Sequence, residues 1–175
     1  PMKDDLTVDH DALARHCRDL IQNGCDGVVL MGTTGEANSL SVVERKELLE
    51  KALGSGVPAD QFIVGTGCSA FTDTLDLTRH AVERGVRAVL MLPPFYYKKV
   101  TDDGLFAAFD TVIRRAADSR IRIILYHFPQ MSGIAFSDNL VRRLTESHPD
   151  AVRGMKDSGG DFKHMERLCR ALPEF

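Results

Sequence analysis

The sequence predicts an α/β protein with a parallel sheet, either doubly wound or part of an eight-stranded barrel. Five short apolar runs recur about every 25 to 35 residues, which is the length of a strand–helix unit. Each run leads through a glycine or proline turn into a segment with helical spacing of apolar residues. The runs are rich in Val, Ile and Leu, as in strands buried on both faces of a parallel sheet.

The first element is expected to be a helix, with no strand before it. Leu13, Cys17, Leu20 and Ile21 follow helical spacing, and Asn23-Gly24 offers a stop. The expected strands follow at residues 27–31, 62–66, 87–92, 121–126 and 151–155.

The segments between these strands predict helices, about six in all. Ser41 and Glu44 have the spacing of a capping box, and Gly54 marks the end of the helix that they begin. Apolar residues in 105–116 also follow helical spacing, as do those of the helix that begins after Ser41. We interpret both apolar stripes as helix faces that pack on the sheet.

The length indicates an incomplete barrel. A complete barrel needs about 250 residues, whereas this chain has 175, opens on a helix and stops soon after Lys156. We therefore expect residues 1–175 to form a single, partial (β/α)₈ TIM-barrel domain of about five strands, with the first strand and the last βα units missing.

The composition favours a small-molecule substrate. A net charge of −3 gives no electrostatic footprint for nucleic acid or an anionic membrane. No apolar run is long enough for a membrane span, and the acidic N-terminus lacks a signal-peptide pattern. The four cysteines form no CxxC pair and no metal-type spacing with histidine, so we expect reduced thiols, mostly packed in the core of a cytoplasmic protein.

A glycine motif, Gly65-Thr66-Gly67-Cys68-Ser69-Ala70, matches the dinucleotide fingerprint but stands alone. The fingerprint also requires an acid about 20 residues on, and here the next strand ends in Leu92-Pro93-Pro94. We set a nicotinamide or flavin site aside and expect these glycines to allow close approach of a ligand or of neighbouring backbone.

Lys156 is the most informative residue. It lies where the run 151–155 meets a glycine-rich turn, at the expected carboxyl end of a strand and hence at the mouth of an α/β site. An amine held there and partly stripped of water can lose its proton and attack a carbonyl to form a Schiff base. Taken alone, a lysine at the rim of a sheet favours the plainer interpretation, a charged group that reaches solvent.

Three other strand ends carry chemistry that fits this lysine. Gly32-Thr33-Thr34-Gly35-Glu36 makes a turn whose backbone N–H groups can bind an anion such as the carboxylate of a 2-oxo acid. Tyr126 can carry protons if its neighbours stabilise the phenolate. Phe95-Tyr96-Tyr97 indicates an interface or a pocket rim.

Together, in this order and at these spacings, these residues resemble the dihydrodipicolinate synthase and N-acetylneuraminate lyase family of class I aldolases. Residues 32–36 resemble the family's GTTGE, Tyr126-x-x-Pro129 its YNxP, and Gly154-x-Lys156-Asp157 its Schiff-base segment. The resemblance covers essentially the whole chain and implies a (β/α)₈ barrel that binds pyruvate or a related 2-oxo acid as an imine.

The resemblance also implies the role of each residue. Lys156 would form the imine, and Tyr126 would shuttle protons. Thr33 would link Tyr126 to a tyrosine lent by a neighbouring subunit, a role that falls to Tyr96. Gly32, Thr33 and Thr34 would hold the pyruvate carboxylate. No metal or organic cofactor is implied, the second substrate is an aldehyde, and the borrowed tyrosine implies a homodimer or homotetramer.

The sequence departs from the synthase pattern at Met131, which takes the place of an arginine that helps to hold the carboxylate of aspartate semialdehyde. A thioether cannot make the bidentate contact of a guanidinium. An apolar residue there is more similar to the sialic-acid lyase branch, although Thr33-Thr34 departs from that branch's usual Ser-Thr. His127 replaces the family's usual Asn, and we interpret it as a structural histidine.

Three hypotheses therefore stay open. The first is a pyruvate-dependent carbon–carbon lyase or synthase similar to dihydrodipicolinate synthase. The second is an N-acetylneuraminate lyase-like or other 2-keto-acid aldolase. The third is a non-catalytic barrel fragment that binds 2-oxo acids.

Overall fold

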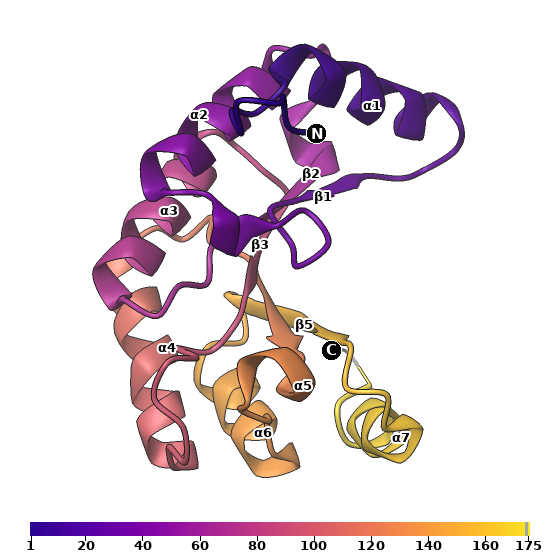
Figure 1. Ribbon diagram of the computed structural model, residues 1–175. Helices are drawn as coiled ribbons and strands as arrows, with labels where there is room; N and C mark the ends of the chain where they lie inside the picture. Colours follow the sequence, from indigo (N-terminus) through magenta and orange to yellow (C-terminus); the bar gives the residue numbers. More distant parts are fainter. Residues whose placement is uncertain (174) are drawn as a thin grey trace.

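The computed structural model describes residues 1–173 and 175, which form one parallel sheet covered by helices (Figure 1). The sheet has the order β1-β2-β3-β4-β5, so neighbours in sequence are neighbours in space. This sequential order excludes a doubly wound sheet, whose order reverses at a switch point. The strands are β1 Val28–Leu30, β2 Phe62–Gly65, β3 Ala88–Met91, β4 Ile123–His127 and β5 Val152–Asp157.

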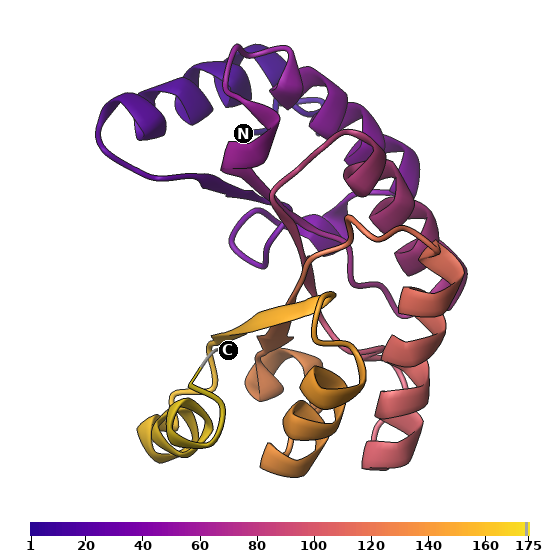
Figure 2. The same ribbon diagram turned by 180° about the vertical axis from the view of Figure 1, so that it is seen from behind.

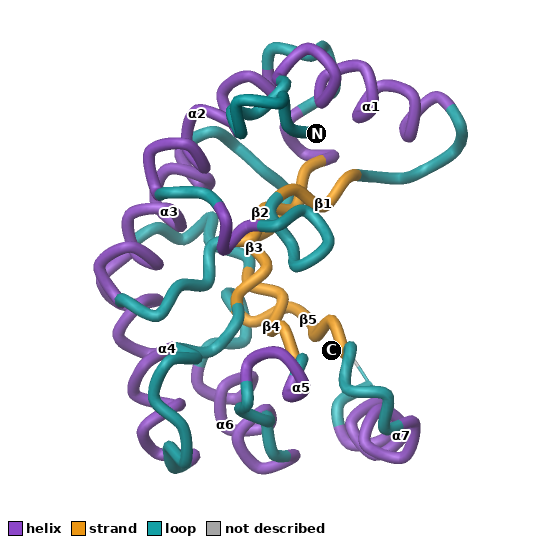
Figure 3. The backbone as a smooth tube through the Cα atoms, in the orientation of Figure 1, coloured by secondary structure: helices purple, strands orange, loops and turns teal. Residues whose placement is uncertain are grey.

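The longer helices lie on one side of the strands and form an outer arc, which is seen from both directions, whereas the short α5 lies inside the arc at the end of β4 (Figures 1 and 2). The tube view shows the strands side by side within this arc (Figure 3). The α-helices are α1 His10–Gln22, α2 Val42–Leu53, α3 Phe71–Glu83, α4 Asp102–Ala116, α5 Pro129–Ser132, α6 Asp138–Ser147 and α7 Phe162–Ala171. Two 3₁₀ turns, η1 Ala37–Ser39 and η2 Ala59–Gln61, complete the elements.

The predicted α/β class and the five predicted strands are confirmed, with small shifts at their ends. The central strand β3 is buried along its whole length, as predicted. The outermost strands differ, because each has a neighbour on one side only among the described residues. Val29 of β1 is 46% exposed, and β5 is only partly buried beyond Val152.

Local capping explains where the helices begin. The predicted capping box of α2 is present, since the Ser41 hydroxyl accepts from the Glu44 N–H and the Glu44 carboxylate accepts from the Ser41 N–H. Side chains of Asp9, Thr101 and Ser137 cap α1, α4 and α6 in the same way. In the part of the chain that the structure describes, no helix is both long and apolar enough to cross a membrane.

The short helix α5 is an element that the sequence did not predict. It begins with Pro129 at its first turn and ends at Gly133, whose φ of 68° is left-handed. A single turn is too short for apolar periodicity to appear.

The four cysteines are free, and the expectation that they pack mostly in the core is wrong for two of them. Cys17 is buried and Cys68 is half-buried, but Cys25 and Cys169 are exposed. Cys25 lies just after α1, and Cys169 lies on α7 at an open hollow that it lines together with Met155 and Asp157 of β5.

The glycines of the Gly65-Thr66-Gly67 motif allow close packing of neighbouring backbone, which is one of the two alternatives that the sequence predicted for them. A Cβ at Gly65 would lie 1.9 Å from the Met31 carbonyl oxygen, and a Cβ at Gly67 would lie 2.5 Å from the Leu92 nitrogen. These contacts hold the end of β2 against the chain that leaves β1 and β3, where the candidate site lies.

Replacing Gly65 with alanine is expected to lower the free energy of unfolding by about 1–3 kcal/mol, because the backbone must move to admit the methyl group. Gly104→Ala is the matched control. A Cβ there meets nothing closer than the Thr101 hydroxyl oxygen, at 3.5 Å. That variant is expected to be neutral or up to about 1 kcal/mol more stable. Urea unfolding measures both, and equal stability of the two variants would contradict the packing argument.

Candidate active site

Thr33, Tyr126 and Lys156 meet at the carboxyl edge of the sheet. Thr33 follows β1, Tyr126 lies near the end of β4, and Lys156 lies near the end of β5. Tyr126 and Lys156 are register partners in the parallel ladder, so both side chains leave the same face of the sheet. The Thr33 and Tyr126 hydroxyls share a hydrogen bond of 3.1 Å, and Lys156 Nζ lies 4.0 Å from the centroid of the Tyr126 ring.

The turn after β1 presents backbone N–H groups at the same edge. The chain reverses through left-handed conformations at Met31 and Glu36, with φ of 55° and 53°. The Glu36 N–H donates to the Thr33 carbonyl, and the Ala37 N–H donates to the Gly32 carbonyl. Among the described residues, the N–H groups of Thr33 and Thr34 have no hydrogen-bond acceptor. They therefore remain available to an anion.

Lys156 is more exposed than the sequence predicted. Its side chain is exposed, because β5 is an outermost strand among the described residues. Its amine is nevertheless held, since Nζ donates a hydrogen bond of 2.8 Å to the Ser158 hydroxyl. Ser158 was not among the site residues that the sequence predicted.

Tyr126 is buried, with 4% of its surface exposed. Burial disfavours its phenolate, but contacts with Lys156 and with the Thr33 hydroxyl outweigh burial and hold the Tyr126 pKa below its usual value. A tyrosine with a lowered pKa gives up and takes back its proton more readily, as a proton carrier requires.

Tyr96 lies apart from this group. It is 72% exposed in the connection between β3 and α4, and its ring packs edge-on against Tyr97 at 5.1 Å. Among the described residues, no hydrogen bond joins it to Thr33 or Tyr126. Met131, on α5, is 62% exposed.

A second group of polar side chains lies behind the sheet, and the sequence did not predict it. Because side chains alternate along a strand, His127 and Asp157 point away from the face that carries Tyr126 and Lys156. His164 of α7 joins them, with Nδ1 2.9 Å from Asp157 Oδ2 and its ring centroid 4.7 Å from that of His127. The sequence did offer one signal for this group. His127 and Asp157 directly follow Tyr126 and Lys156, so the alternation of side chains along a strand places both on the opposite face of the sheet.

The residues His127, Asp157 and His164 also offer ligand atoms within 4.8 Å of one another, a set that Zn²⁺ accepts. Internal hydrogen bonds already use several of these atoms. His127 Nδ1 accepts from the Phe136 N–H at 3.1 Å, and Asp157 Oδ1 accepts from the Gly159 N–H at 2.7 Å. The arrangement is that of a buried hydrogen-bonded network.

His127→Asn is expected to make stability less dependent on pH. Burial holds the pKa of His127 below its ordinary value of 6.5, an effect that His164 strengthens and Asp157 opposes. The folded protein therefore favours the neutral ring. Its contribution to stability is complete above about pH 6.5 and is lost as the pH falls toward the folded-state pKa, because the unfolded chain binds the proton first.

Urea unfolding at several pH values between about 7 and 5 tests this expectation. An asparagine does not titrate, and its Oδ1 can accept from the Phe136 N–H as His127 Nδ1 does. The variant should lose less stability than the parent over this range. The same loss in both proteins would contradict the assignment to His127.

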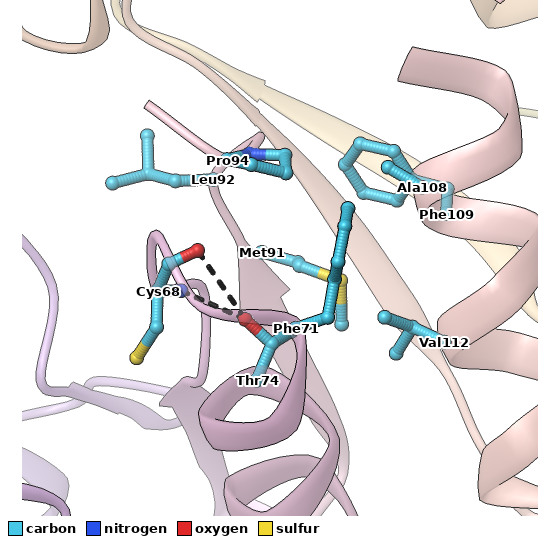
Figure 4. Close-up of a pocket in the computed structure, with 9 residues that line it drawn as sticks. All are labelled: Cys68, Phe71, Thr74, Met91, Leu92, Pro94, Ala108, Phe109 and Val112. Carbon is cyan, nitrogen blue, oxygen red and sulfur yellow. Dashed lines mark hydrogen bonds between the residues drawn. The ribbon is translucent and has the colours of Figure 1, made fainter. Parts of the chain in front are cut away.

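A small pocket elsewhere in the sheet is apolar and belongs to the packing between β3, α3 and α4 (Figure 4). At its rim, the Thr74 hydroxyl accepts from the Cys68 N–H at 3.0 Å. The Cys68 sulfur points away from the pocket (Figure 4) and accepts from the buried Arg45 guanidinium. None of the residues that line this pocket belongs to the Thr33–Tyr126–Lys156 group.

The chain is similar to known proteins along its whole length. Residues 1–175 match the model of the "Dihydrodipicolinate synthetase family". An "Uncharacterized DapA-like lyase" of Chloroflexus aurantiacus is 38% identical over 167 residues, which are 95% of this chain and 55% of that protein. The chain thus spans about half the length of the curated relatives that it matches.

Solved structures agree with the fold. A dihydrodipicolinate synthase from Agrobacterium tumefaciens superposes with a TM-score of 0.97 and 38% identity, covering 100% of this chain and 61% of that one. YagE from E. coli K12, a member of the dihydrodipicolinic acid synthase family solved in complex with pyruvate, has a TM-score of 0.88 and 28% identity, covering 99% and 58%. The five strands therefore correspond to part of a (β/α)₈ barrel, as predicted.

Proposed function

The chain belongs to the dihydrodipicolinate synthetase family, and from this premise we propose that it forms a lysine Schiff base with pyruvate or a related 2-oxo acid. The observation that carries the proposal is the meeting of Thr33, Tyr126 and Lys156 at one edge of the sheet. An amine, a proton carrier and a hydroxyl that orients the carrier are the groups that imine formation needs. The pyruvate bound to YagE supports the choice of substrate class.

Pyruvate binds with its carboxylate at the turn of residues 32–36, where the N–H groups of Thr33 and Thr34 are unused. This places the ketone carbon toward Lys156 and its oxygen toward Tyr126. Gly32 has no side chain and leaves the anion room to approach the backbone.

Lys156 attacks the ketone as the neutral amine. A bond forms between Nζ and the carbonyl carbon, the π electrons move to oxygen, and that oxygen takes a proton from Tyr126. Nζ then loses a proton and restores the Tyr126 hydroxyl. Tyr126 then gives its proton to the carbinolamine hydroxyl, which leaves as water while the nitrogen lone pair forms the C=N bond of the protonated imine, and Tyr126 is left as the phenolate. Tyr126 suits these transfers because its pKa is lowered and Thr33 orients its hydroxyl.

The imine then allows carbon–carbon chemistry. It withdraws electrons, so the adjacent methyl group gives a proton to the Tyr126 phenolate. The resulting enamine attacks the carbon of an aldehyde, and the aldehyde oxygen takes the proton from Tyr126 as the new carbon–carbon bond forms. The same steps in reverse cleave the bond. No step in this sequence calls on a metal ion or an organic cofactor.

Trapping with sodium borohydride in the presence of pyruvate tests the proposal. The reductant converts an imine into a stable secondary amine, which intact-mass and peptide analysis locate. We expect one adduct, on Lys156. Folded protein that yields no adduct with pyruvate or with other 2-oxo acids would contradict the enzyme and favour a non-catalytic binding barrel.

The second candidate is a sialic-acid lyase-like or other 2-keto-acid aldolase, and Met131 favours it. This exposed thioether, on the short helix α5 that follows β4, offers no charge to a carboxylate on the incoming aldehyde. Comparing an aldehyde that carries a carboxylate with a neutral sugar aldehyde separates the two candidates. Faster turnover of aspartate semialdehyde would favour the synthase.

The tyrosine pair also favours an assembly of subunits. Tyr96 and Tyr97 expose most of their surface, and exposed aromatic side chains are typical of protein interfaces. We propose a homodimer or homotetramer in which Tyr96 of one subunit completes the hydroxyl chain of another.

A further inference from the structure

The turn after β5 holds the amine of Lys156 in place. Lys156 Nζ donates to the Ser158 hydroxyl at 2.8 Å. A hydroxyl that accepts one N–H of a neutral amine leaves the nitrogen lone pair free for a carbonyl. A carboxylate in the same place would favour the protonated, unreactive ammonium. The Ser158 hydroxyl can therefore orient the Lys156 amine without favouring its unreactive, protonated form.

The position of Ser158 depends on the conformation of residues 157–160, which three hydrogen bonds hold, one of them from the Gln130 side-chain amide to the Gly159 carbonyl. The Ser158 N–H donates to the His127 carbonyl at 2.8 Å, which extends the strand pairing by one residue. The Gly159 N–H donates to Asp157 Oδ1 at 2.7 Å and closes the turn on itself. Gly159 packs so closely on the His127 ring that a Cβ there would lie 2.9 Å from Nε2.

Asp157 is in turn held by helix α7. Its Oδ2 lies 2.9 Å from His164 Nδ1, and the two side chains are only 6% and 8% exposed. Because Asp157 points away from the face that carries Lys156, its charge does not serve as a counter-ion for the amine. A buried carboxylate with two hydrogen-bond partners is an anchor that resists movement.

We propose that Ser158 is a catalytic contact of the Lys156 amine, and that Asp157 and His164 are positioning residues that act on Lys156 through Ser158. The proposal rests on the proposed Schiff-base function and adds to it the group that aims the nucleophile. Lysine side chains have large rotamer freedom, so an exposed amine gains most from such a partner.

A double-mutant cycle tests the proposal, with the rate of borohydride trapping at saturating pyruvate as the measurement. Ser158→Ala and Asp157→Ala are each expected to slow imine formation about 10- to 100-fold, the size of effect that misplacing a reacting group causes. If Asp157 acts through Ser158, the double variant should be no slower than Ser158→Ala alone. The pyruvate concentration at half-saturation should change far less than the rate.

Two variants control for general loss of structure. Asp138→Ala removes the carboxylate on the other side of His164, whose Oδ1 lies 3.3 Å from Nε2, without touching Asp157. It should lower thermal stability and leave the trapping rate near that of the parent. Asp157→Asn should restore most of the rate lost in Asp157→Ala, because the amide can accept from Gly159 and donate to His164.

The outcomes separate this inference from the proposed function. A parent protein that traps no 2-oxo acid overturns the Schiff-base proposal itself. If the parent traps pyruvate and Ser158→Ala traps it at the same rate, the role of Ser158 is overturned. The Ser158→Ala variant should fold, because it removes only one hydroxyl from a half-buried turn. Single effects that multiply in the double variant overturn the claim that Asp157 acts through Ser158.

Discussion

Lys156→Arg is expected to abolish the pyruvate adduct and to reduce turnover by at least about 10³-fold. Arginine keeps the positive charge and a long apolar stem, but its guanidinium stays protonated and cannot act as the nucleophile. Loss of a residue that forms the covalent intermediate has the largest effect open to a single substitution in such a site. The measurement combines borohydride trapping with the rate of product formation.

Lys51→Arg is the matched control. Lys51 is exposed in the last turn of α2 and lies outside the Thr33–Tyr126–Lys156 group, so its replacement should leave both measurements unchanged. A pyruvate adduct that persists in Lys156→Arg would show that another amine forms the imine. That result would remove the central residue of the proposal.

Tyr126→Phe is expected to slow imine formation by about 10²- to 10⁴-fold, the range for loss of a general acid–base group. The ring remains and still packs under Lys156 Nζ, at 4.0 Å in the parent. The hydroxyl is lost, together with its 3.1 Å hydrogen bond with Thr33 and its contact with the Lys156 amine. The variant therefore separates proton transfer from the packing that holds the amine.

The rate of trapping at saturating pyruvate and the midpoint of thermal unfolding are measured together. A slow variant with a parental unfolding midpoint supports the proton-carrier role. A variant that traps pyruvate at the parental rate would contradict that role and would leave water as the proton carrier.

The residues of the candidate site were predictable because each lies at the end of an apolar run. Parallel strands bring their carboxyl ends to one edge, so residues far apart in sequence meet there. Residues 32–36, Tyr126 and Lys156 were identified in this way, and the register of β4 and β5 places the last two directly opposite each other. Tyr96 keeps its predicted role as a proposal about a second subunit.

The group behind the sheet was not predictable in the same way. His127 was interpreted as a structural histidine, and Asp157 as part of a motif, but nothing in the spacing indicated that His164 of α7 would contact Asp157 at 2.9 Å. That contact depends on how α7 returns to the sheet. The amphipathic pattern of a helix indicates which face packs on the sheet. It does not determine which single residue of that face contacts a given strand residue.

The sequence alone determined the class of the fold, the order of the strands and of the longer helices, and the identity of the residues at the strand ends. It could do so because strand periodicity, capping residues and turn glycines act over a few residues. Only the tertiary structure decided the exposure of Lys156, the amine contact with Ser158 and the buried Asp157–His164 pair. These depend on which strands and helices become neighbours, and distances between such neighbours follow from packing of the whole domain rather than from any local pattern.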